Sequence, residues 1–250
     1  MKRIVSIQDI SCLGRCSLTV ALPVVSAMGV ECAIVPTAVL STHTAFPGFT
    51  CKDLTDQLPP IARHWRSQNV AFDAISTGYI ASAPQTRQVL DFVAAIRRPG
   101  TLLVVDPAMA DHGKLYAGFD DDFPQAMAQV VAQADVALPN LTEACLLTGA
   151  SFSPDKLGAM GYDSDTGAYF TCLGPRHPAS FHGTGDIFAA VVTGGLVRGM
   201  TLKQTAQLAV DFTLDCIRAT ERDPAAGWYG VEFEKALPAL IRRMDDWKAE

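Results

Sequence analysis

The chain has 250 residues, of which 49% are hydrophobic and 18% are charged, and its formal net charge is −6. This length is enough for one domain with a sizeable hydrophobic core. The acidic balance argues against nucleic acid or an anionic membrane surface as a partner. Any anion that binds would therefore have to be held by local backbone geometry rather than by a basic surface.

The sequence carries no sign of membrane insertion, secretion or a disulfide framework. Its apolar runs are shorter than a membrane span, and residues 1–7 enter a strand-like run without the long apolar segment of a signal peptide. The seven cysteines are scattered and include no C-x-x-C pair, so we expect reduced core thiols rather than a metal or redox site. We therefore expect a single domain, residues 1–250, in the cytoplasm.

Strand-like and helix-like segments alternate along the first half of the chain. Expected strands cover residues 3–8, 31–36 and 101–106, and expected helices cover residues 17–28 and 84–97. The first helix stops before Gly29, a residue type that favours the position after a helix C-terminus. Residues 102–105 are apolar without polar alternation, which is typical of a strand buried on both faces in a parallel sheet.

The second half continues this alternation. Helices are expected at residues 122–133, 142–148, 187–196, 202–220 and 232–247, a short strand at 135–138, and a β-hairpin from 157–162 and 167–172. Asn140 precedes Glu143 by three residues, a spacing close to a capping box at a helix start. Alternating strands and helices around a buried strand predict a three-layer α/β fold, α-β-α, with a mostly parallel central sheet.

Three polar residues are expected at the carboxyl ends of strands, where ligands bind in open α/β sheets. These residues are Asp106, Asn140 and Glu143. Their convergence predicts a ligand site at this edge of the sheet.

The segment Gly183-Thr184-Gly185-Asp186 lies between a polar loop and the apolar helix expected at residues 187–196. Two glycines allow a sharp turn and a close approach to a ligand, and the amides at a helix start form an anion site. Asp186 adds a carboxylate beside that site. An anion cradle with a base next to it suits phosphoryl transfer to an alcohol. The alternative is an ordinary loop in which Asp186 caps the helix.

Two common nucleotide-binding sequences are missing. The chain contains no G-x-x-x-x-G-K-[ST], and no G-x-G-x-x-G follows its first expected strand. A P-loop kinase and a dinucleotide-dependent enzyme are therefore disfavoured.

Six motifs in a fixed order are similar to those of one protein family. They are Ser6-Ile7-Gln8, residues 40–44 (L-S-T-H-T), Thr77-Gly78-Tyr79, residues 106–111 (D-P-A-M-A-D), residues 139–144 (P-N-L-T-E-A) and residues 183–186 (G-T-G-D). Together they resemble the pyridoxal/pyridoxamine kinases of the ribokinase-like superfamily, over residues 3 to about 220. The fourth motif has Ala where the family usually has Val and Gly.

The resemblance implies a reaction and roles for the last motif. The expected activity is ATP- and Mg²⁺-dependent phosphorylation of the 5′-hydroxymethyl group of a B6 vitamer. Asp186 would be the general base that takes the proton of this hydroxyl group. The amides of Gly183, Thr184 and Gly185 would hold the charge on the transferring phosphoryl group.

The resemblance also implies a metal and phosphate region and a ring pocket. The ATP phosphates would be bound by Asp106, Asn140 and Glu143. Asp106 and Glu143 are the candidates for the metal, because Mg²⁺ keeps much of its water shell and needs few protein ligands. Thr44 would hydrogen-bond the pyridine ring and Tyr79 would pack against it.

Each of these roles has a structural alternative. Glu143 could only cap its helix, Tyr79 could be a core aromatic, and Asp106 could cap a loop through its own backbone turn. His43 could brace its loop without contacting substrate.

Asp9 departs from the family pattern, which has a serine after S-I-Q in contact with the ring. An aspartate could pair with a protonated ring nitrogen or accept a hydrogen bond from the ring 3-hydroxyl, or Ser11 could take over this contact. A loop acid that faces solvent is the remaining possibility. The preferred vitamer therefore stays open, and hydroxymethylpyrimidine stays a possible substrate.

A second departure lies near residue 150. The family has a further helix and strand between the helix at 142–148 and the hairpin, and about 30 residues needed for such a unit are missing here. The missing strand would ordinarily lie beside the ATP phosphates. The chain either carries a true deletion with a compromised ATP site or is shorter than the functional gene product.

Two alternatives to a B6 kinase follow. One is a hydroxymethylpyrimidine kinase of thiamine synthesis, and the other is a catalytically impaired homologue that only binds its ligand.

Residues 222–230 form a turn-rich loop that could border the adenine. Because family members commonly pair, we also expect a homodimer.

Overall fold

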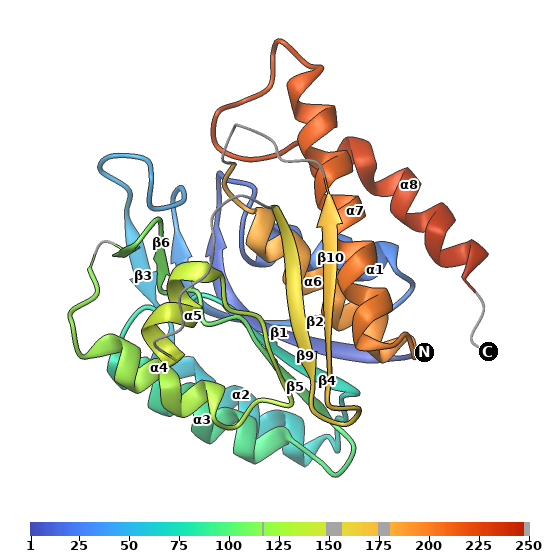
Figure 1. Ribbon diagram of the computed structural model, residues 1–250. Helices are drawn as coiled ribbons and strands as arrows, with labels where there is room; N and C mark the ends of the chain where they lie inside the picture. Colours follow the sequence, from blue (N-terminus) through green and yellow to red (C-terminus); the bar gives the residue numbers. More distant parts are fainter. Residues whose placement is uncertain (117, 149–156, 175–180, 248–250) are drawn as a thin grey trace. The chain divides into compact units, whose positions relative to one another are not determined.

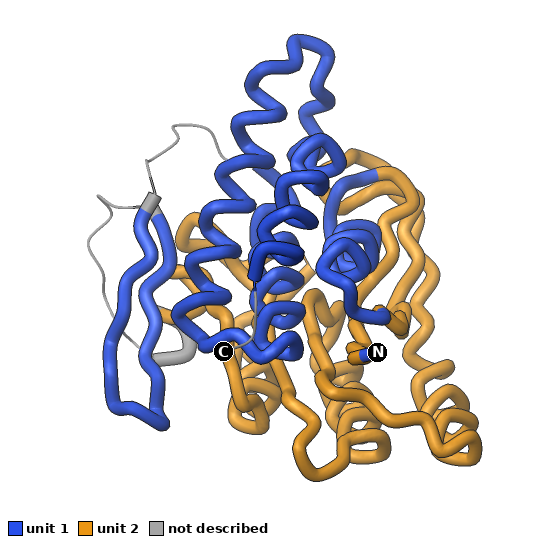
Figure 2. Tube along the Cα trace, turned by 90° about the vertical axis from the view of Figure 1, so that its right-hand side faces the viewer, with its two compact units in different colours: residues 1, 14–31, 153–250 blue, residues 2–13, 32–152 orange. Residues whose placement is uncertain are grey.

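The computed structural model describes residues 1–116, 118–148, 157–174 and 181–247. The chain divides into two compact units (Figure 2). Unit 1 comprises residues 1, 14–31 and 153–250, and unit 2 comprises residues 2–13 and 32–152. The expectation of a single domain stays a prediction.

Unit 2 is built on a six-stranded sheet with the strand order β3-β2-β1-β4-β5-β8. The strands are β1 (Arg3–Ser11), β2 (Glu31–Leu40), β3 (Cys51–Asp53), β4 (Ala74–Thr77), β5 (Leu102–Val105) and β8 (Val136–Ala137). The β1–β4, β4–β5 and β5–β8 pairs are parallel, and β3 joins β2 antiparallel at one edge. Parallel pairing aligns the carboxyl ends of β1, β4, β5 and β8 along one edge of the sheet.

Helices α2 (Leu58–Ser67), α3 (Ala83–Ile96) and α4 (Phe123–Val131) cover one face of this sheet (Figure 1). Alternate strand residues such as Ile7, Ile75 and Val105 meet these helices in a buried apolar core. After β5 the chain forms a small hairpin of β6 (Ala110–Asp111) and β7 (Lys114–Leu115). Helix α5 (Leu141–Thr148) follows β8.

Unit 1 contains four helices and a β-hairpin among its described residues. The elements are α1 (Leu18–Ala27), β9 (Leu157–Asp163), β10 (Ala168–Gly174), α6 (Thr184–Val197), α7 (Leu202–Glu221) and α8 (Phe233–Asp246). Helix α6 packs between α1 and α7, and α8 packs on α7. The hairpin lays Phe170 and Cys172 on α7, whereas Tyr162 and Tyr169 face outward.

Most expected elements are present, and the prediction of an α/β fold with a mostly parallel sheet is confirmed. Helix α2, strands β3 and β4 and the β6–β7 hairpin were not expected. Helix α2 begins with Leu58-Pro59-Pro60, which looks like a loop signal in sequence. Proline is nevertheless tolerated in the first helical turn, where its missing N–H has no helical acceptor.

The expected missing unit falls between α5 and β9. Residues 149–156, which separate these elements, lie outside the described residues. Among the described strands, β8 is the last of the six-stranded sheet, and β9 and β10 pair only with each other.

The described residues bear on two sequence expectations, which concern the cysteines and membrane-spanning helices. Six of the cysteines are described, and all are free thiols; burial raises the pKa of Cys32 to about 11. No described helix is long and apolar enough to cross a membrane.

Candidate active site

The G-T-G-D segment forms the start of helix α6 in unit 1. Gly183 occupies the N-cap position with φ 82°, and no side chain caps the helix. The first amides of a helix have no intrahelical acceptors and lie at the positive end of its dipole. This turn therefore offers backbone donors to an anion.

Only glycine fits at residue 183. Its φ lies in the left-handed region, and a Cβ there would be 1.9 Å from the carbonyl oxygen of Arg15. Gly185 differs, because a Cβ at that position would meet no atom within 4 Å. Gly183 therefore allows the backbone turn, and Gly185 leaves the start of the helix open.

Asp186 lies in the first turn of α6 and is half-buried. Gly183, not Asp186, occupies the N-cap position. Thr184 donates a hydrogen bond from Oγ1 to the carbonyl oxygen of Phe181, at 3.1 Å, which ties the helix start to the preceding loop. The carboxylate therefore stands beside the backbone donors, an arrangement that suits base-assisted transfer of a phosphoryl group to an alcohol.

In unit 2, Asn140 and Glu143 form a reciprocal capping box at the start of α5. The Asn140 side chain accepts from the Glu143 amide at 3.0 Å, and Glu143 Oε2 accepts from the Asn140 amide at 2.9 Å. The predicted capping spacing is therefore realised, with Asn in place of Ser or Thr.

Glu143 also holds the loop that follows β5. Its Oε1 accepts from the amides of Met109 and Ala110, at 3.0 and 3.4 Å, and Asn140 Nδ2 donates to the Ala110 carbonyl at 2.7 Å. The side chain is 1% exposed, and burial raises its pKa although three backbone N–H groups act in the opposite direction. Asp106, half-buried at the end of β5, begins this loop. The D-P-A-M-A-D and P-N-L-T-E-A motifs are thus one connected structure.

We expect Glu143→Gln to lower the free energy of unfolding by about 1–3 kcal/mol, because an amide NH₂ would face backbone N–H donors that now have an acceptor. Denaturant unfolding measures this difference. Asp91→Asn is the matched control, since Asp91 is an exposed acid on α3 with a surface ion pair to Arg87 and should change stability little. Equal, small changes in both variants would contradict the bridging role of Glu143.

Two further motifs meet where β4 ends beside the middle of β1. Ile7 pairs with Thr77 in the sheet, and the buried Gln8 side chain lies over Gly78. A Cβ at residue 78 would be 2.6 Å from Gln8 Oε1. A side chain at residue 78 would therefore displace the buried Gln8 side chain.

Asp9 follows Gln8 and is 4% exposed, so it is not an acid that faces solvent. Ser11 donates a hydrogen bond to Asp9 Oδ2 at 3.1 Å. Burial raises the pKa of Tyr79, and the nearby charges of Asp9 and Cys51 raise it further. Asp9, Ser11 and Tyr79 are therefore neighbours at this edge of unit 2.

The remaining ring-pocket candidates differ in exposure. Tyr79 is half-buried and stacks on Phe119, with ring centroids 5.6 Å apart. Thr44 is exposed in the loop between β2 and β3, whereas its neighbour His43 is buried and accepts a hydrogen bond from the Ala45 amide. Tyr79 therefore has an aromatic neighbour, whereas Thr44 is exposed on its loop.

The predicted residues thus form two groups. Unit 1 carries Gly183, Thr184, Gly185 and Asp186. Unit 2 carries the residues named for ring, metal and phosphate, which are Asp9, Ser11, Thr44, Tyr79, Asp106, Asn140 and Glu143. Sequence reasoning missed Arg15, whose backbone contacts Gly183. The only signal for it was a glycine before an arginine at residues 14–15.

Comparison with known proteins gives relatives over the whole chain. A pyridoxal kinase from Lactobacillus plantarum is 32% identical with a TM-score of 0.88, and the match covers 100% of both chains. A protein from Bacteroides thetaiotaomicron that is named as a phosphomethylpyrimidine kinase and was solved with pyridoxal is 35% identical, with a TM-score of 0.89 over 96% of this chain and 95% of its own.

A further relative is more distant in sequence. The pyridoxal kinase of Arabidopsis thaliana is 25% identical over 98% of this chain and 90% of its own. A scan against models of protein families finds none that matches. The full-length match to the Lactobacillus enzyme, on the ribokinase-like fold, decides the assignment: the chain belongs to the pyridoxal kinase family.

Proposed function

We propose that the protein is an ATP-dependent kinase that phosphorylates the 5′-hydroxymethyl group of pyridoxal, pyridoxamine or pyridoxine. The observation that carries this proposal is the uncapped start of α6 with Asp186 in its first turn, in a member of the pyridoxal kinase family. The relative solved with pyridoxal supports a B6 vitamer as the acceptor.

In this reaction Asp186 takes the proton of the 5′-hydroxyl group as its oxygen attacks the γ-phosphorus of ATP. A new P–O bond forms to the vitamer, the bond to the β-phosphate oxygen breaks, and ADP leaves. The amides of Gly183, Thr184 and Gly185 hold the negative charge of the transferring group.

A magnesium ion bound largely through water and phosphate would need only one carboxylate from unit 2. Mg²⁺ supplies neutralisation of phosphate charge and needs few protein ligands. Asp106 is the carboxylate that would face the ion. Glu143 already accepts three backbone N–H bonds, so it acts by fixing the loop after Asp106, together with Asn140.

The ring of the vitamer is assigned to Asp9, Ser11, Thr44 and Tyr79. Asp9 is buried beside Tyr79, so its carboxylate can recognise a protonated ring nitrogen or the 3-hydroxyl group. Tyr79 packs on the ring of the vitamer. Thr44, on the loop between β2 and β3, donates a hydrogen bond to the ring or accepts one from it.

We expect Asp9→Asn to lower kcat/KM about tenfold or more for the vitamers, because it removes a charged hydrogen-bond acceptor. Steady-state assays with pyridoxal, pyridoxamine and pyridoxine measure the change. Asp56→Asn, at an exposed acid before α2, is the control and should leave kcat/KM unchanged. Equal kinetics of wild type and Asp9→Asn would remove Asp9 from ring recognition.

One second candidate remains, since the Bacteroides relative is named a phosphomethylpyrimidine kinase. Competition among the three B6 vitamers and hydroxymethylpyrimidine, at fixed Mg·ATP, separates the two activities. The proposal expects a B6 vitamer to have the highest kcat/KM, and preference for the pyrimidine would replace it. A homodimer in the cytoplasm belongs to the same proposal, and it rests on the family resemblance and the composition.

A further inference from the structure

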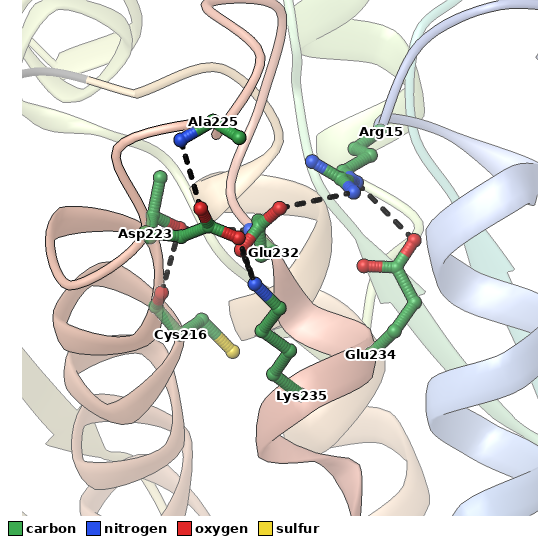
Figure 3. A network of polar contacts seen from close by, with 8 residues as sticks. Arg15, Cys216, Asp223, Ala225, Glu232, Glu234 and Lys235 are labelled. Atoms are coloured by element: carbon green, nitrogen blue, oxygen red, sulfur yellow. Dashed lines mark hydrogen bonds and ion pairs between the residues drawn. The ribbon is translucent and has the colours of Figure 1, made fainter.

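Arg15 contacts two other segments of unit 1: the start of α8 through its side chain (Figure 3) and the G-T-G-D turn through its backbone. It lies just before α1, and its guanidinium faces the acids at the start of α8. Nε is 3.2 Å from Glu234 Oε1, and Nη2 is 3.7 Å from Glu232 Oε1. The guanidinium carbon also lies 5.7 Å from the centroid of the Tyr229 ring, within the range of a cation–π contact.

The backbone of Arg15 is enclosed by two glycines. A Cβ on Gly183 would lie 1.9 Å from the Arg15 carbonyl oxygen, and a Cβ on Gly230 would lie 2.7 Å from Arg15 Cβ. Gly183 starts the G-T-G-D turn, and Gly230 belongs to the loop before α8. The same residue is therefore in close contact with the proposed phosphate site and with the C-terminal loop.

Residues 222–232 form this C-terminal loop, and it is held at both ends. The Glu232 amide donates to Thr220 Oγ1 at 2.8 Å, and Thr220 Oγ1 donates to the Cys216 carbonyl of α7 at 2.8 Å. Lys235 of α8 pairs with both Glu232 and Asp223 (Figure 3). The loop is thus a fixed support rather than a free segment.

The burial of this network makes Arg15 important to it. The side chains of Arg15 and Glu232 are 20% and 10% exposed. A carboxylate this buried is costly without its cations, and arginine can bridge two acids with its planar group, which lysine cannot do equally well. Loss of the guanidinium would leave Glu232 to Lys235 alone and release the segment whose carbonyl packs on Gly183.

We propose that Arg15 is a positioning residue for phosphoryl transfer: it transmits the fixed geometry of the C-terminal loop to the G-T-G-D turn. The direction of the Thr184 and Gly185 amides depends on the left-handed conformation of Gly183, and the Arg15 carbonyl occupies the space beside it. This inference rests on the proposed function, which supplies the step that the turn serves.

The test compares Arg15→Gln and Arg15→Lys with Arg218→Gln, a matched change at an arginine of α7 that pairs with Asp215. We expect Arg15→Gln to lower kcat about tenfold to a hundredfold, as small displacements at a reacting centre do, with the KM for pyridoxal changed less than about twofold. Arg15→Lys should recover part of kcat, and Arg218→Gln should match wild type.

Hydrogen exchange of a peptide covering residues 181–190 gives a second readout that does not need activity. In Arg15→Gln the amides of this peptide should exchange faster while peptides from α7 keep their wild-type rates. Unchanged kcat and unchanged exchange would overturn the proposal, and so would a uniform rise in exchange across the chain, which marks general destabilisation. If wild type phosphorylates no vitamer, the proposed function fails, and the exchange result still decides whether Arg15 fixes the G-T-G-D turn.

Discussion

Asp186→Asn is expected to cut turnover at least about a hundredfold while leaving nucleotide and vitamer binding nearly intact. Asparagine keeps the size of the side chain at the first turn of α6 but cannot accept the proton of the 5′-hydroxyl group, and general-base catalysis commonly contributes this much. Steady-state turnover measures the loss, and calorimetric titration with pyridoxal and ADP measures binding.

Asp245→Asn, at an exposed acid of α8 in the same unit, is the control for this experiment. It removes one negative charge from unit 1 without touching the G-T-G-D turn, so it should retain wild-type turnover. Retained activity in Asp186→Asn would remove Asp186 from the mechanism, and loss of binding together with turnover would make it a structural residue.

Gly183→Ala and Gly185→Ala should act in opposite directions on stability, although both add one methyl group to the same motif. Alanine at 183 must adopt φ near 82° and meets the Arg15 carbonyl, so we expect a loss of at least about 1–2 kcal/mol in the free energy of unfolding. Its kcat should fall about a hundredfold, because the amide donors are displaced.

Alanine at 185 meets no atom within 4 Å and lies in a helical turn. It should raise the free energy of unfolding by up to about 1 kcal/mol through helix propensity. Chemical denaturation of both variants, with kcat measured in parallel, tests the predictions for Gly183→Ala and Gly185→Ala. Wild-type stability and turnover in Gly183→Ala would contradict the geometry described for the turn.

The sequence was informative about the fold where local pattern and burial agree. The apolar run at β5 predicts a strand buried on both faces, and the run after Asp186 predicts a buried helix; both are present as β5 and α6. Helix α2 was missed because prolines in its first turn resemble a loop, and β3 was missed because a three-residue exposed edge strand has almost no periodic signal.

The site was predictable to the extent that a motif is local. The capping relation of Asn140 and Glu143 follows from their spacing, since residues three apart meet at a helix start. The contacts of Glu143 with the Ala110 loop, of Gln8 with Gly78, and of Arg15 with Gly183 join residues distant in sequence. Such contacts depend on strand register and helix packing, which no short pattern encodes.

Phosphorus NMR of a reaction containing Mg·ATP and pyridoxal tests the central claim most directly, because it identifies both the donor product and the acceptor atom. The account predicts that ATP is converted to ADP while an equal amount of a new phosphate ester appears on the 5′-oxygen of the vitamer, and that Asp186→Asn slows both signals together. No ester from any vitamer, with pyridoxal still bound, would contradict it and leave a ligand-binding homologue of the pyridoxal kinases.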